Sequence, residues 1–200
     1  RDRGAGLMRL HSHLAVVAAG VLALAALGVP QAGVAAEPGS REAIDQAAAV
    51  NTELALAYMR EGNLKAAREK IDKALQQDAR TANTQMAAGF VYDKLGDKKK
   101  ALSHFEQAVK LGGKDNPDVV ANAAVYFCMN GEPKRGEQYM LQAAASPLNA
   151  RPDVAYTNAG RCARGDGRPK DAEQSFRKAL ARNPKQPDAL MQMAELAQEG

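Results

Sequence analysis

The stretch EGNLKAAREKIDKAL, from Glu61 to Leu75, begins with a turn glycine and continues with small and large apolar residues at helical spacing. The same arrangement follows three later glycines, as GDKKKALSHFEQAV from residue 96, GEPKRGEQYMLQAA from residue 131 and GRPKDAEQSFRKAL from residue 167. These glycines are separated by 34, 35 and 36 residues. A nearly fixed period of this length is typical of a repeat protein, in which each unit packs on the next one.

Each glycine is followed by the same pattern of side chains. A small residue comes five positions after the glycine, a large apolar residue nine positions after it, and another small residue twelve positions after it. Residues at these intervals lie on one side of an α-helix and let a neighbouring helix approach closely. A small residue also comes seven positions before each glycine, and in three copies an aromatic residue comes four positions before it. We therefore expect pairs of antiparallel helices.

This pattern resembles the tetratricopeptide repeat, a unit of two antiparallel helices in about 34 residues. The resemblance rests on Tyr58, Gly62, Ala67, Gly89, Tyr92, Gly96, Ala101, Phe105, Gly131, Gly160, Gly167, Ala172, Phe176 and Pro184. Gly136 and Ala163 depart from the family pattern, which leaves the boundaries of the third and fourth units open. The resemblance implies an all-α, helix-turn-helix superhelix. An aromatic content of 4% and the absence of Trp also suit helices packed through small side chains.

The N-terminal residues have the composition of a secretory signal peptide. We take Met8 as the start of translation, because a basic segment and the uncharged run LAVVAAGVLALAALGV follow it. The small residues Val34 and Ala36 predict cleavage before Glu37. Residues 1–36 are then upstream residues and signal peptide, and a retained membrane anchor is the alternative.

The remaining chain is divided into two segments. Residues 37–47 are expected to be a linker and the start of the first helix, and residues 48–200 a repeat domain of four units with a partial fifth. This fifth unit, QPDALMQMAELAQEG, stops where its turn glycine is expected. We favour a fragment of a longer array over a lone capping helix.

The two cysteines, Cys128 and Cys162, each fall among apolar residues of an expected helix. In an exported chain they could form a disulfide. A buried free thiol, however, commonly packs as a small hydrophobic side chain. We therefore expect free thiols, with pairing as the alternative. No cysteine directly follows the apolar run, where a lipoprotein would carry its lipid.

The first helices of stacked units are expected to line a concave groove. Helical phase places in this groove Thr52, Leu56, Met59, Met86, Phe90, Lys94, Asn122, Val125, Met129, Thr157, Asn158, Arg161 and Arg164. The side-chain amides of Asn122 and Asn158 can both donate to and accept from a peptide backbone. The predicted groove is apolar toward the N-terminus and basic toward the C-terminus. We therefore expect its ligand to be an extended peptide segment with apolar and acidic residues.

Several other classes of function have no residues to support them. Removing residues 1–36 leaves 24 basic and 22 acidic residues, too balanced a charge to predict nucleic-acid binding. His104 is the one histidine after the signal peptide, and neither cysteine has a nearby histidine to activate it. The sequence therefore predicts a non-catalytic protein with no cofactor and no metal site.

The repeat domain is also similar to the PilW or PilF family of type IV pilus biogenesis and stability proteins. The similarity is carried by the stretch NTELALAYMREGNLKAAREKIDKALQQD, by ANAAVYFCMNGEP and by the segment beginning ASPLNARPDVAYTNAG. It implies a scaffold, or pilotin, that helps the pilus secretin reach and assemble in the outer membrane, and hence supports twitching motility. The implied location is the periplasm, with peripheral association with the outer membrane left open. A periplasmic adaptor for another envelope or cell-division complex is the alternative.

Overall fold

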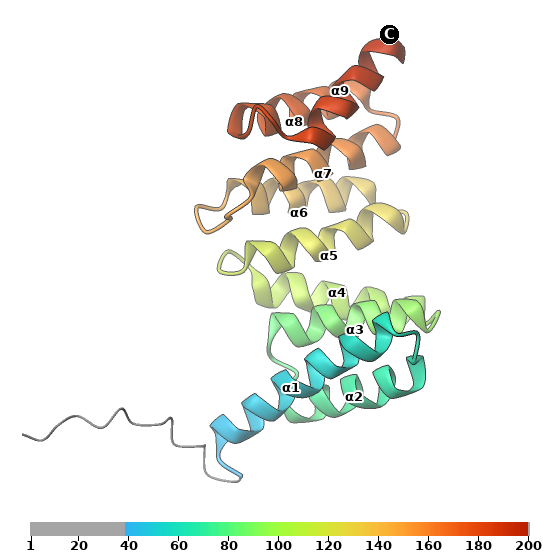
Figure 1. The fold of residues 1–200 in the computed structure, drawn as a ribbon, viewed down its shortest axis with the longest axis vertical. Coiled ribbons are helices and arrows are strands. Elements are labelled where there is room, and N and C mark those ends of the chain that lie inside the picture. The colour runs from blue at the N-terminus through green and yellow to red at the C-terminus, as the bar shows by residue number, and fades with distance from the viewer. Residues whose placement is uncertain (1–38, 200) are drawn as a thin grey trace, which may run out of the picture. The chain divides into compact units, whose positions relative to one another are not determined.

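The computed structural model describes residues 39–199, and every regular element in that range is an α-helix. The helices are α1 (Arg41–Arg60), α2 (Leu64–Gln77), α3 (Ala82–Lys94), α4 (Lys98–Gly112), α5 (Pro117–Met129), α6 (Pro133–Ala145), α7 (Pro152–Gly165), α8 (Pro169–Arg182) and α9 (Pro187–Glu199). Figure 1 shows them stacked in chain order as antiparallel pairs. The prediction of an all-α array of helix pairs is confirmed. The expected signal peptide lies outside the described residues.

Short polar residues and prolines set where the helices begin. The side chains of Ser40, Asn63, Thr81, Asp97 and Asn116 each accept a hydrogen bond from the backbone N–H three residues later. This contact satisfies one of the unpaired donors at a helix N-terminus. From α5 to α8 the first turn contains a proline, whose missing N–H costs nothing there. The helix α1 begins at Arg41, within residues 37–47, the segment expected to contain a linker and the start of the first helix.

The four turn glycines that define the repeat all have a left-handed backbone. Their φ angles are 77° at Gly62, 79° at Gly96, 91° at Gly131 and 72° at Gly167. A residue with a Cβ would be strained in this conformation, whereas glycine adopts it freely. The chain reverses direction at each of them and starts the second helix of the unit.

The large residue in the second helix of each unit is buried. Phe105 and Phe176 are fully buried, as is Ile71, and Met140 is 2% exposed. The small residue in the first helix makes room for the aromatic ring, because a Cβ at Gly89 would lie 2.9 Å from the Phe105 ring. A Cβ at Gly160 would overlap the Phe176 ring in the same way. The small and large residues therefore alternate in the sequence because the two helices of each unit pack against each other through them.

Ion pairs connect the second helices of neighbouring units. The guanidinium group of Arg135 in α6 lies 3.0 Å from the Glu106 carboxylate in α4. One unit later, Arg168 at the start of α8 lies 2.5 Å from Glu137 in α6. The hydrogen bond that the Arg168 guanidinium donates to the Glu137 carboxylate is the main reason that the pKa of Arg168 is raised. No helix among residues 39–199 combines the length and the hydropathy that a transmembrane span requires.

Candidate partner-binding surface

The first helices α1, α3, α5 and α7 form one face of the array, which we call the groove face. It consists of the residues predicted to line the groove that retain accessible surface. Those partly buried are Leu56, Met59, Met86, Phe90, Val125, Asn158 and Arg164, and those exposed are Lys94, Asn122, Met129 and Arg161. A side chain must be accessible to solvent if it is to contact a partner. The role of these residues in partner contact therefore stays a prediction.

Two threonines assigned to this face are mostly buried. Thr157 is 2% exposed, and its hydroxyl donates to the Asp153 carbonyl oxygen over 2.7 Å. Thr52 is 7% exposed and donates to the Ala48 carbonyl oxygen over 2.8 Å. Its hydroxyl also lies 3.1 Å from that of Thr84 in the next unit. The prediction for Thr157 is wrong, because a hydroxyl bonded within its own helix is small enough to pack against a neighbouring helix. Thr52, although mostly buried, still lines a hollow of the groove face.

Toward the N-terminus, the groove face contains a hollow of about 330 Å³ between α1 and α3. It brings together Thr52, Leu56 and Met86 from the predicted set. The hollow is also lined by Asp45 and Glu53, two acidic residues that helical phase did not assign to the groove. This half of the groove face is therefore apolar and acidic.

Toward the C-terminus, a larger hollow of about 550 Å³ opens between α5 and α7, and we call it the α5–α7 cleft. It is lined by Val125, Cys128, Met129, Gly131, Pro133, Met140, Asn158, Arg161, Cys162 and Gly165. Four of these residues, Val125, Met129, Asn158 and Arg161, belong to the predicted groove. The cleft brings together more of the predicted residues than the hollow between α1 and α3 does.

Other predicted residues lie outside both hollows. The Phe90 ring stands edge-on to the Phe105 ring, with centroids 5.1 Å apart, so it also belongs to the core between α3 and α4. Lys94, Met59 and Asn122 lie on the groove face without lining either hollow. The predicted residues therefore do not form one continuous pocket.

The two arginines predicted in the groove differ in their contacts. The Arg164 guanidinium donates to the Gln192 side-chain oxygen over 3.0 Å and forms an ion pair with Glu195, both in α9. Arg164 therefore ties α7 to the last helix. Arg161 is exposed on α7, and no carboxylate between residues 39 and 199 forms an ion pair with it. Its charge is available at the rim of the cleft.

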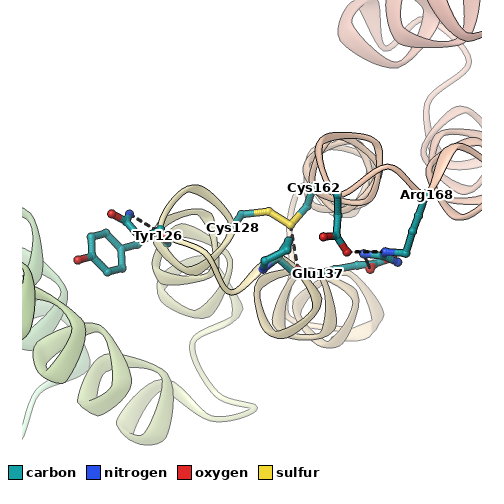
Figure 2. The surroundings of a disulfide bond; sticks show 8 residues. Tyr126, Cys128, Glu137, Cys162 and Arg168 are labelled. Atoms are coloured by element: carbon teal, nitrogen blue, oxygen red, sulfur yellow. Dashed lines mark hydrogen bonds and ion pairs between the residues drawn. A yellow bond between two sulfur atoms is a disulfide. The ribbon is translucent and has the colours of Figure 1, made fainter.

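Cys128 and Cys162 are joined by a disulfide, so the expectation of free thiols is wrong. The bond links α5 to α7 (Figure 2). The two Cα atoms are 5.7 Å apart, and both residues line the cleft. Their separation of 34 residues is close to the repeat period. Stacking places residues one period apart on adjacent first helices. The separation by one repeat period was therefore the feature of the sequence that indicated a disulfide. It is missed when each helix is considered alone.

His104 is part of a closed cluster rather than a reactive site. Its ring stacks on Tyr92 with centroids 5.3 Å apart, and its Nδ1 lies 2.7 Å from the Gln85 side-chain oxygen. The Tyr92 hydroxyl donates to the Asp72 carboxylate, and burial, followed by this hydrogen bond, raises the pKa of Tyr92 to about 12. Across the described range there is no cluster of histidine, cysteine and acidic residues that could hold a metal ion.

Comparisons with known proteins agree with this architecture. Models of the tetratricopeptide repeat match residues 46–112 and residues 155–197. The type IV pilus assembly protein PilF of Pseudomonas aeruginosa is 25% identical over 152 residues, which are 76% of this chain and 60% of that protein. The chain thus spans less than two thirds of this relative.

Solved structures of two such pilus proteins have the same fold. The crystal structure of PilW, described as a widely conserved type IV pilus biogenesis factor, has a TM-score of 0.65 at 27% identity, over 76% of this chain and 69% of PilW. The solved structure of P. aeruginosa PilF has a TM-score of 0.68 at 24% identity, over 78% of this chain and 70% of PilF. The chain is therefore a tetratricopeptide-repeat protein, homologous to PilF and similar in structure to the type IV pilus proteins PilW and PilF.

Proposed function

We propose that this protein is a non-catalytic scaffold of type IV pilus biogenesis that binds the pilus secretin and promotes its assembly in the outer membrane. The observation that carries the proposal is the similarity to PilF and PilW, which extends over three quarters of the chain in both sequence and structure. Repeat arrays of this kind use extended surfaces to bind other proteins. The groove face offers such a surface, with an exposed cation and apolar side chains.

A gene deletion in a host that makes type IV pili tests this proposal. We expect loss of surface pili and of twitching motility, unchanged pilin synthesis, and a secretin that migrates as monomer instead of heat-stable multimer. Expression of the wild-type gene should restore the multimer. So should Lys178→Glu, which changes an exposed residue of α8 away from both groove hollows. Normal secretin multimer in the deletion strain would instead favour an adaptor for another envelope or cell-division complex.

The proposed location of the protein is the periplasm, reached by means of the N-terminal signal peptide. We expect the mature chain to begin at Glu37 and to be released with the periplasmic fraction without detergent, because the apolar run of residues 14–29 is removed. N-terminal sequencing and fractionation measure both points. A chain that still begins at Met8 and needs detergent for release would show that the apolar run is kept as an anchor.

A further inference from the structure

The α5–α7 cleft has the dimensions of a binding site and a partly apolar lining. Its volume of about 550 Å³ falls within the usual range for ligand pockets, roughly 300 to 1,000 Å³. Val125 and Met129 contribute apolar side chains from α5, and Met129 is 79% exposed. Met140, only 2% exposed, also lines the cleft, which therefore reaches the core. An apolar side chain from outside could bury surface here that is now in contact with water.

The charge of the cleft is of one sign. Among its lining residues, all within residues 39–199, Arg161 alone carries a charge. Arg135 and Arg168, on other elements of the same units, are held by carboxylates of the protein itself. Arg161 has no such partner in the described residues. A planar guanidinium forms two parallel hydrogen bonds with a carboxylate, so an acidic side chain is the complementary ligand.

An amide lies beside this cation. Asn158 precedes Arg161 by three residues on α7, so both side chains are on one face of the helix. The Asn158 side chain forms no hydrogen bond with any residue of the described range. It retains a donor and an acceptor for the backbone of an extended chain.

The disulfide fixes the two walls of the cleft relative to each other. The bonded residues, Cys128 and Cys162, belong one to each wall. The two helices make few other direct contacts, because α5 packs mainly against α6, and α7 packs against both α6 and α8. A covalent link that holds a binding site in its bound shape lowers the ordering cost of association.

From these observations we propose that the α5–α7 cleft is the specificity subsite for an extended partner segment that carries an aliphatic or methionine residue within two positions of an acidic one. The apolar side chain enters the cleft, the carboxylate binds Arg161, and the Asn158 amide bonds the backbone between them. The disulfide keeps the cleft open at a fixed width. This inference rests on the proposed function, because it assumes that the groove face binds a protein partner. It specifies only the side chains that the partner must carry.

Selection of random twelve-residue peptides displayed on phage against the oxidised protein tests the subsite without a known partner. We expect enriched peptides to contain Asp or Glu within two positions of Leu, Ile, Val or Met. Binding of these peptides, measured by fluorescence anisotropy, should be at least tenfold weaker for Arg161→Glu. It should be unchanged for Arg182→Glu, a matched charge reversal on an exposed arginine of α8. Higher salt should weaken binding to the wild type much more than to Arg161→Gln.

The disulfide is tested with the same peptides and the double variant Cys128→Ser, Cys162→Ser. We expect severalfold weaker binding with an unchanged helical circular dichroism spectrum. If the double variant does not fold, Met129→Asp replaces it as a test of the apolar wall, because that exposed position tolerates substitution. No enriched peptide, an enriched set without acidic residues, or equal affinity for wild type and Arg161→Glu would each overturn the subsite. Equal affinity for the folded double-serine variant would overturn the role of the disulfide.

The outcomes separate this inference from the proposed function. If deletion of the gene abolishes the secretin multimer but no acidic and apolar peptide is selected, the pilus function stands and the subsite is wrong. If such peptides are selected and depend on Arg161 while the secretin multimer is normal in the deletion strain, the subsite stands and its partner is not the secretin.

Discussion

Gly136 shows how the absence of one side chain sets the distance between two helices. It stands where the other units have alanine, and from the sequence it was only a departure from the family pattern. In the structure, a Cβ at this position would lie 2.7 Å from the Ala124 carbonyl oxygen and 2.8 Å from the Cys128 amide nitrogen. Both atoms belong to the backbone of α5 and cannot rotate away. The glycine therefore allows α5 and α6 to pack at backbone contact.

We predict that Gly136→Ala destabilises the protein by about 2 to 3 kcal/mol, the usual cost of forcing extra volume into a packed interior. The midpoint of urea unfolding measures the change. Gly165→Ala is the matched control, because it is also on a helix and nothing lies within 4 Å of its added Cβ. The control should change stability by less than about 1 kcal/mol. Equal midpoints for the two variants would show that α5 and α6 are not in backbone contact.

His104 makes the stability of the array depend on pH. Burial and then the nearby Lys100 ammonium lower its pKa below the usual 6.5, although Asp72 and Asp97 act in the opposite direction. As the pH falls below about 6.5, His104 is protonated more readily in the unfolded chain than in the folded chain. The free energy of unfolding therefore decreases as the pH decreases below that value.

We predict that the urea midpoint of the wild-type protein falls between pH 7.5 and pH 5.5, and that His104→Gln falls less. Glutamine keeps a hydrogen-bonding side chain but has no proton to bind in this range. No other histidine lies within residues 39–199, so the difference between the two proteins reports on this residue. Parallel pH profiles for both proteins would mean that His104 does not contribute.

At the scale of helices, sequence patterns predicted most of the fold because they act over one unit. The turn glycines at 62, 96, 131 and 167 and the small-and-large alternation each depend on neighbours within about 30 residues. The pairing of Arg164 with Glu195, by contrast, depends on how α9 stacks on α7. Helical phase alone could not separate Arg164 from Arg161, which has the same charge and lies one turn earlier. Contacts between units had to come from the structure.

The disulfide is the strongest link between two units, and its removal should affect stability more than that of any surface ion pair. It closes a loop with a sequence separation of 34 residues. For a loop of that length the chain-entropy estimate is about 3 to 4 kcal/mol. We predict a loss of up to this amount for the variant Cys128→Ser, Cys162→Ser, measured by urea unfolding. The reduced wild-type protein serves as control and should show the same loss. Unchanged stability in both would mean that the cysteines are not bonded in the native protein.

At the scale of the whole molecule, the period of the sequence predicted a stacked array, and the stacking determines which surface is available. The second helices are joined by the Arg135–Glu106 and Arg168–Glu137 ion pairs, whereas the groove face keeps Arg161 and Met129 accessible. The identity of a partner could not be predicted in this way, because repeat proteins with the same packing bind different ligands through different surface residues. For that step the proposal depends on the similarity to PilF and PilW.

Site-specific photo-crosslinking in a piliated host tests most directly whether the groove face binds the secretin. A photoreactive amino acid at Met129, which lies in the α5–α7 cleft and is 79% exposed, is compared with the same amino acid at Lys178, an exposed residue of α8. We predict a crosslink to the pilus secretin from position 129 and none from position 178, with the product identified by mass spectrometry. Secretin crosslinks of equal yield from both positions, or none from position 129 in cells where the protein restores piliation, would contradict the account.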